Sequence, residues 1–104
     1  MTERDLEGMS ITEIAPQIRS KKVSPVELTN VFLKRIERIN PLLNAYTTVT
    51  EESAREQAQA AEDEIRRDRY RGPLHGVPIS VKENICIKGV KTTAGSKALA
   101  DWVP

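Results

Sequence analysis

The sequence predicts an α/β protein in which helices come first and strands follow. Two runs with helix caps and apolar residues at helical spacing lie between residues 10 and 40, and an alanine-rich run follows residue 51. A β-branched stretch interrupts them at residues 45–50, and a further apolar stretch lies among glycine- and proline-rich turns after residue 71. We therefore divide the chain into a mainly helical part with one strand, residues 1–70, and a strand-and-loop part, residues 71–104.

The composition is that of one small domain with a thin core. Of 104 residues, 38% are hydrophobic and 4% aromatic. A net charge of +1 provides no general attraction for nucleic acid or membranes, and no apolar run approaches the length of a bilayer span. The charged start, Met1–Asp5, is unlike a signal peptide. One cysteine and one histidine make neither a disulfide nor a zinc site, so we expect a cytoplasmic protein without metal or cofactor.

The first predicted helix begins at Ser10. Ser10 and Glu13 have the spacing of a capping box, in which each side chain bonds the other's backbone N–H. Apolar residues then recur at helical spacing, namely Ile11, Ile14, Ala15 and Ile18. Pro16 removes one hydrogen bond of this helix, so we expect it to be short or kinked.

The second predicted helix is the clearest element. It begins with Ser24 as N-cap, Pro25 at the first helical position and Glu27 completing a second capping box. A broad apolar stripe follows, formed by Leu28, Val31, Phe32, Leu33, Ile36 and Ile39. We expect the helix to end at Asn40, because a residue that precedes proline avoids the helical region.

A strand and a third helix are predicted next. Residues Ala45–Thr50 are β-branched and aromatic, which suits a strand. The helix is expected from about Glu51 to Arg69, with a narrow buried stripe of Ala54, Ala58, Ala61 and Ile65. Two i, i+4 ion pairs are expected on its solvent side, Glu62 with Arg66 and Asp63 with Arg67. The alternating charges near its end indicate a solvated helix terminus rather than a nucleic-acid site.

The remaining residues are predicted to be strand and loop. Gly72–Pro78 is a turn-rich connector, Ile79–Glu83 a strand, and Cys86–Val90 a second extended piece or a turn. A loop at 92–96 and a short helix at 97–101 follow. The chain stops at Trp102-Val103-Pro104 without a polar tail, and we interpret this as the end of a fragment.

Lys82 is the candidate catalytic residue. In a strand it shares one face with Ser80, and burial would disfavour its charged form, so that it could act as a neutral base. The alternative is an exposed lysine that protects an edge strand, which the pattern alone favours. Ser80 and Lys82 could also form a dyad of their own, since residues i and i+2 of a strand lie about 6.5 Å apart. That dyad would still need an oxyanion hole.

The other reactive residues have weaker claims. Cys86 lies in an apolar run and is better interpreted as a small buried residue than as a nucleophile. His75 lies in a turn without a carboxylate partner in the sequence, which favours a structural or solvent-exposed role. Gly95 and Ser96 could present backbone N–H groups to an anion, but nothing else in the sequence supports such a site.

The segment from Gly72 to Ser96 closely resembles the amidase signature family. The resemblance rests on Gly-Pro-Leu-His-Gly-Val-Pro-Ile-Ser-Val-Lys-Glu-Asn from residue 72, then on Lys88-Gly89-Val90 and on Thr-Thr-Ala-Gly-Ser from residue 92. The earlier segments, residues 6–43 and 44–46, are similar to the opening helices and strand entry of that family. Glu83 stands where many members have aspartate. The family includes bacterial amidases and the A subunit of glutamyl-tRNA amidotransferase.

The resemblance implies a large α/β domain with a mixed sheet, of which this chain supplies the N-terminal helices and first strands. It also implies hydrolysis of carbon–nitrogen amide bonds by a Ser–cisSer–Lys triad, with Lys82 as the base. The family's two serines lie downstream, in a segment that this chain does not contain. We therefore expect an N-terminal fragment, inactive alone, that acts on a small-molecule amide only when completed by that segment. The alternatives are a non-catalytic remnant or interaction module that binds a partner or self-associates, and the A component of a tRNA-dependent amidotransferase.

Overall fold

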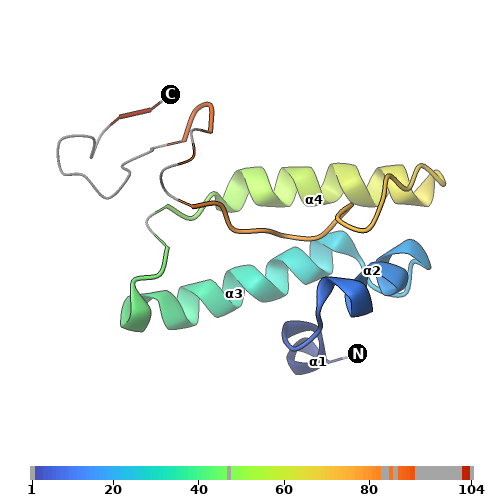
Figure 1. Cartoon of the computed structure of the whole chain (residues 1–104), viewed down its shortest axis with the longest axis horizontal. Helices are drawn as coiled ribbons and strands as arrows, with labels where there is room; N and C mark the ends of the chain where they lie inside the picture. The colour runs from blue at the N-terminus through green and yellow to red at the C-terminus, as the bar shows by residue number, and fades with distance from the viewer. Residues whose placement is uncertain (1, 47, 83–84, 86, 91–101, 104) are drawn as a thin grey trace.

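The computed structural model describes residues 2–46, 48–82, 85, 87–90 and 102–103. This part of the chain contains the helices α1 (Glu3–Glu7), α2 (Ile11–Arg19), α3 (Pro25–Leu43) and α4 (Glu51–Arg66). The two long helices, α3 and α4, pack side by side, and α1 and α2 lie at one end of them (Figure 1). The segment after α4 turns back and runs along the α3–α4 pair.

The predicted helix starts are confirmed. Ser10 and Glu13 form both bonds of a capping box at the start of α2, which is short and contains Pro16. Ser24 caps α3 by accepting from the backbone N–H of Glu27 at 3.2 Å, but the return bond from the Glu27 side chain that would complete the predicted capping box is not among the bonds of the described residues. Its hydroxyl also donates to Glu62 of α4, so this cap ties the two long helices together. Helix α1, with a capping box of its own, was not predicted.

Two predicted helix ends are wrong. Helix α3 continues through Pro41 to Leu43, because Pro41 costs one hydrogen bond only in its last turns. It ends at Asn44, which adopts the left-handed conformation that asparagine tolerates (φ 50°). Helix α4 ends at Arg66 rather than Arg69, and Asp68 adopts a left-handed φ of 58° just beyond it.

The predicted strands are not formed in the described residues. Residues 45–46, 48–50 and 79–82 are irregular, so the described part of the chain is helical and the α/β sheet is not confirmed. A strand is stable only when a neighbouring strand pairs with it. Instead, the side-chain amide of Asn40 bonds both backbone groups of Tyr46, at 2.8 and 3.1 Å. Residues 87–90 form a turn, as one of the two alternatives predicted, and the loop and helix predicted at 92–101 lie outside the described residues.

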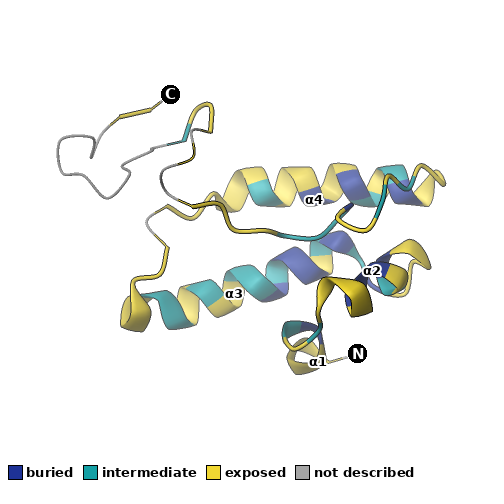
Figure 2. Cartoon of the chain, in the orientation of Figure 1, coloured by how far each residue is buried: buried dark blue, intermediate teal, exposed yellow. Residues whose placement is uncertain are grey.

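The hydrophobic core lies at one end of the helix pair. It is made by residues of α1, α2, the α2–α3 connection, the start of α3 and the end of α4, namely Leu6, Ile14, Ile18, Val23, Leu28, Val31 and Ile65. Figure 2 shows α3 changing from buried near α2 to half-buried and then exposed toward its other end. The alanine stripe of α4 is buried as predicted at Ala58 and Ala61.

Candidate functional site

A tight turn at residues 72–77 packs on the helical core and leads into the lysine-bearing segment. His75 N–H donates to the carbonyl of Gly72 at 3.0 Å, and Val77 N–H donates to that of Leu74 at 3.1 Å. Gly76 has a positive φ of 84°, and a Cβ atom there would lie 2.8 Å from Cγ of Pro25. The turn therefore fixes where the chain leaves the core, and only glycine fits at this contact.

His75 anchors this turn. It is 8% exposed, and its Nδ1 accepts a hydrogen bond from the backbone N–H of Arg71 at 3.0 Å. An accepting Nδ1 places the proton of the neutral ring on Nε2, which has no hydrogen-bond partner among the described residues and lies 3.8 Å from a carboxylate oxygen of Glu64. The Tyr70 ring lies 5.9 Å from the imidazole, centroid to centroid. These contacts support the structural role, rather than the exposed one, among the alternatives for His75.

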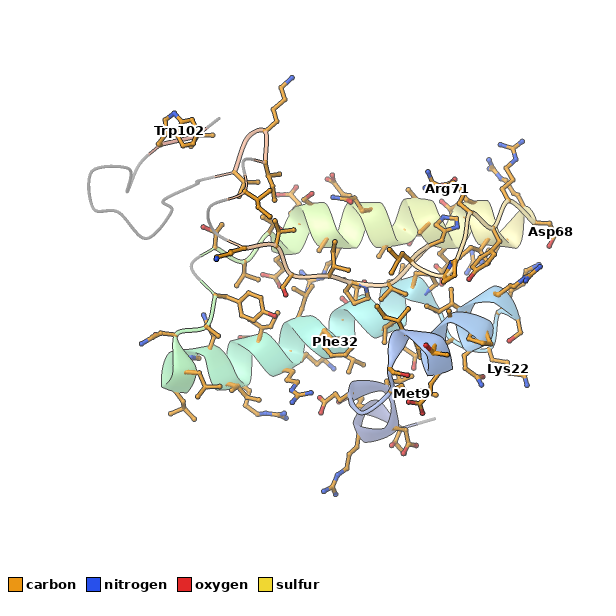
Figure 3. The ribbon with its side chains drawn as sticks, viewed as in Figure 1. Met9, Lys22, Phe32, Asp68, Arg71 and Trp102 are labelled. Carbon is orange, nitrogen blue, oxygen red and sulfur yellow. The ribbon has the colours of Figure 1, made fainter. Side chains whose placement is uncertain are left out.

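The charges around the end of α4 form local pairs. Arg71 binds Glu64 at 3.0 Å, Lys21 binds Asp68 at 3.1 Å, and Arg66 binds Glu62 at 3.6 Å (Arg71 and Asp68 are labelled in Figure 3). The predicted pair of Asp63 with Arg67 is not among the ion pairs of the described residues. Arg67 lies beyond the last residue of α4, and Asp63 accepts from Gln59. This pairing fits the predicted solvated helix terminus.

Beyond Pro78 the chain passes over an apolar groove of about 810 Å³. One wall comes from the middle of α3, where Phe32 is labelled in Figure 3, and a second from the α3–α4 connection and the start of α4. The segment from Pro78 to Lys82 forms the third wall, together with Ile85, Ile87 and Val90. Sequence reasoning missed this groove, because its walls come from stretches that are distant in the chain.

Lys82 lies on this groove and is exposed, as is Ser80. Among the described residues, no ion pair or side-chain hydrogen bond engages the Lys82 ammonium. Its backbone carbonyl accepts from Ile85 N–H at 3.0 Å. The side chain is thus neither buried nor paired with a carboxylate within the described part of the chain. Cys86, Gly95 and Ser96, the other predicted candidates in this region, lie outside the described residues.

The described residues contain no group of three or more histidine, cysteine, aspartate or glutamate side chains arranged to hold a metal ion. None of the described helices has both the length and the apolar character needed to cross a membrane.

Sequence comparison assigns the family. The profile of the family described as Amidase matches residues 27–104, which include most of α3, all of α4, the turn and Lys82. This chain belongs to the Amidase family. No solved structure matches it significantly.

Two relatives of this Amidase-family chain carry the same name. The A subunit of glutamyl-tRNA(Gln) amidotransferase from Bdellovibrio bacteriovorus is 43% identical over 100 residues, which make up 96% of this chain and 20% of that protein. The protein of the same name from Dechloromonas aromatica is 45% identical over 94 residues, 90% of this chain and 19% of that protein. The chain therefore spans about a fifth of the length of the curated relatives it matches.

Proposed function

We propose that residues 1–104 are the N-terminal, lysine-bearing part of an amidase domain that hydrolyses carbon–nitrogen amide bonds, and that this part is inactive alone. Residues 1–70 form its helical support and residues 71–104 carry Lys82. The observation that carries the proposal is the Amidase match, which runs through Lys82 and the groove on which it lies. The substrate is a small-molecule amide, bound only when the remaining part of the domain is present.

Lys82 acts in this proposal as the base of a Ser–cisSer–Lys relay. Its neutral amine takes a proton from a bridging serine, which takes one from the nucleophilic serine as that oxygen attacks the amide carbonyl. The proton then moves to the leaving nitrogen, which departs as ammonia or an amine, and water hydrolyses the acyl-enzyme to the acid. Within the described part of the chain Lys82 is exposed and forms no ion pair, so in this proposal the remaining part of the domain supplies the burial that a neutral amine requires.

Two alternatives have support of their own. Both relatives named above are amidotransferase proteins, so the domain could release ammonia for amidation of glutamyl-tRNA(Gln) rather than act as a free amidase. A non-catalytic interaction module is supported by the exposed apolar side chains near Lys82, such as Ile79 and Val81. A self-contained Ser80–Lys82 dyad has less support, because both residues are exposed and no hydrogen bond joins their side chains in the described part of the chain.

A chimera tests the proposal. This chain replaces the matched fifth of the Bdellovibrio bacteriovorus protein, and amide hydrolysis is measured for the parent chimera and for Lys82→Met, which keeps the length of the side chain and removes its base. We expect Lys82→Met to lower the rate by about 10²- to 10⁴-fold, the usual contribution of a general base. Lys88→Met, at a second exposed lysine, is the control and should leave the rate unchanged.

Two results would contradict the proposal. An active Lys82→Met chimera would remove Lys82 from the mechanism. Turnover of a simple amide by the purified 104-residue chain would show that the chain is not inactive alone, and loss of that turnover in Ser80→Ala would assign it to the dyad.

A further inference from the structure

We propose that an uncovered apolar surface of this chain is the docking site for the remaining part of an amidase domain. This uncovered surface comprises the C-terminal half of α3, residues 46–49 where described, and the residues of 79–87 that the structure describes. The surface itself follows from burial and backbone geometry. Only the identity of its occupant rests on the proposed function.

Helix α3 shows the first sign that a cover is missing. Its apolar stripe begins in the core, where Leu28 is 1% exposed and Val31 is also buried. The same stripe continues through the half-buried residues Phe32, Leu33, Ile36 and Ile39. It is followed by Leu42, which is 82% exposed. An apolar stripe of this length predicts a covering surface along the whole helix, and α4 with the returning segment covers only part of it.

The segment after Pro78 shows the second sign. Ile79 is 72% exposed, and Val81, Ile85 and Ile87 are also exposed although they lie close together in sequence. The backbone N–H groups of residues 79–82 donate no hydrogen bond to any described residue. An irregular segment with apolar side chains and unpaired backbone donors can bind a partner by pairing with a strand of it.

The occupant is inferred from the length of the relatives. They are about five times as long as the region matched here, so in them a much larger body of chain is available to pack against this region. Part of the groove of about 810 Å³ lies in the uncovered surface, where Ile36, Val49 and Ile79 line it, and it gives that surface a concave region for such a body. Outside this surface and the C-terminal Trp102 and Val103, the large exposed apolar residues of the described chain are Ile11 and Leu74.

Binding of two polypeptides tests the inference. The partner is the Bdellovibrio bacteriovorus protein without the region matched here, and the labelled 104-residue chain is titrated with it by fluorescence anisotropy. We expect saturable binding that Ile79→Lys weakens at least tenfold. Leu74→Lys is the matched control, because Leu74 is 61% exposed in the same stretch of chain but does not line the groove, and it should change the Kd less than twofold.

A second measurement decides the matter if the shortened partner does not fold. The same two substitutions are made in the single-chain chimera and in the 104-residue chain, and thermal unfolding and amide exchange are compared. Ile79→Lys should lower the Tm of the chimera by several degrees and leave the 104-residue chain unchanged, whereas Leu74→Lys should leave both unchanged. The amides of residues 79–82 should exchange at least tenfold more slowly in the chimera.

The outcomes separate this inference from the proposed function. Equal effects of the two substitutions, unprotected amides at 79–82 in the chimera, or dimerisation of the 104-residue chain that Ile79→Lys abolishes would each overturn the docking site. None of these readouts involves hydrolysis. An inactive chimera with protected 79–82 amides would instead contradict the catalytic proposal and leave the docking site supported.

Discussion

The two ends of the α3–α4 pair are built from similar residues and reach different states. At the closed end, near α2, apolar side chains from α1, α2, α3 and α4 meet in a core, and the turn containing His75 covers its edge. At the open end, α3 carries leucines just as apolar, but Leu42 and Leu43 are exposed, and the segment beyond Pro78 covers them little. The difference shows that the apolar stripe of a helix indicates where a packing partner is needed. Whether the stripe is buried depends on which other segments pack against it.

The largest expected difference between the two ends is the cost of truncating a leucine. Leu28→Ala removes a side chain that is 1% exposed and should destabilise the chain by about 2–5 kcal/mol, enough to unfold a small domain. Leu42→Ala, at the open end, should change the free energy of unfolding by less than about 0.5 kcal/mol. Urea denaturation followed by circular dichroism measures both values. Equal costs would mean that the open end is packed in solution.

A smaller difference is expected between two glycines with positive φ. Alanine at either Gly76 (φ 84°) or Gly89 (φ 79°) should cost about 1–2 kcal/mol for the left-handed conformation. Gly76→Ala should cost about 1–3 kcal/mol more, because its Cβ would meet Pro25, whereas no described atom lies within 4 Å of a Cβ at Gly89. The free energies of unfolding of the two variants test this. If Gly89→Ala is the more damaging, the turn does not pack on α3 as described.

The smallest effect concerns pH and the capped helices at the closed end. Hydrogen bonds from the side chain and then the backbone of Ser10 hold the pKa of Glu13 below its usual value, and the backbone of Thr2 does the same for the pKa of Asp5. A carboxyl with a lowered pKa binds fewer protons in the folded state, so stability is lost as pH falls below the ordinary carboxyl range, about 4.

Thermal unfolding between about pH 6 and about pH 3 measures this effect. We expect the Tm of the parent chain to fall slightly more over this range than that of Ser10→Ala, which lacks the hydroxyl bond to Glu13. An identical fall in both chains would show that this cap does not contribute to the acid sensitivity.

Local features of the fold were predictable from the sequence. The caps at Ser10 and Ser24 and the apolar stripes of α3 and α4 each depend on residues within a few positions of one another. The structure confirms both N-caps and buries part of each stripe, namely Leu28 and Val31 of α3 and Ala58, Ala61 and Ile65 of α4. The errors occur where a distant or competing contact decides the outcome. Asn40 was expected to end a helix, yet it lies within α3 and its amide binds Tyr46. The strand predictions failed for the same reason, since a strand needs a partner that its own residues do not provide.

The candidate site also has features that the sequence predicts and features that depend on the tertiary structure. Lys82 could be chosen from the sequence, because the residues around it carry the family resemblance, and the Amidase match includes it. Its exposure and its place on a groove could not be predicted, because the groove walls come from α3, the α3–α4 connection and the segment after Pro78. Whether Lys82 is the base stays a prediction until the Lys82→Met chimera is measured.

The sequence by itself determined the family and the positions where helices begin, because both depend on short runs of adjacent residues. Only the tertiary structure decided that His75 is buried, that Gly76 must be glycine against Pro25, and that half of the α3 stripe has no cover. Burial and close contact depend on which segments, distant in the sequence, pack together. The free energy of this packing comes from contacts among many residues, so no single residue reveals it.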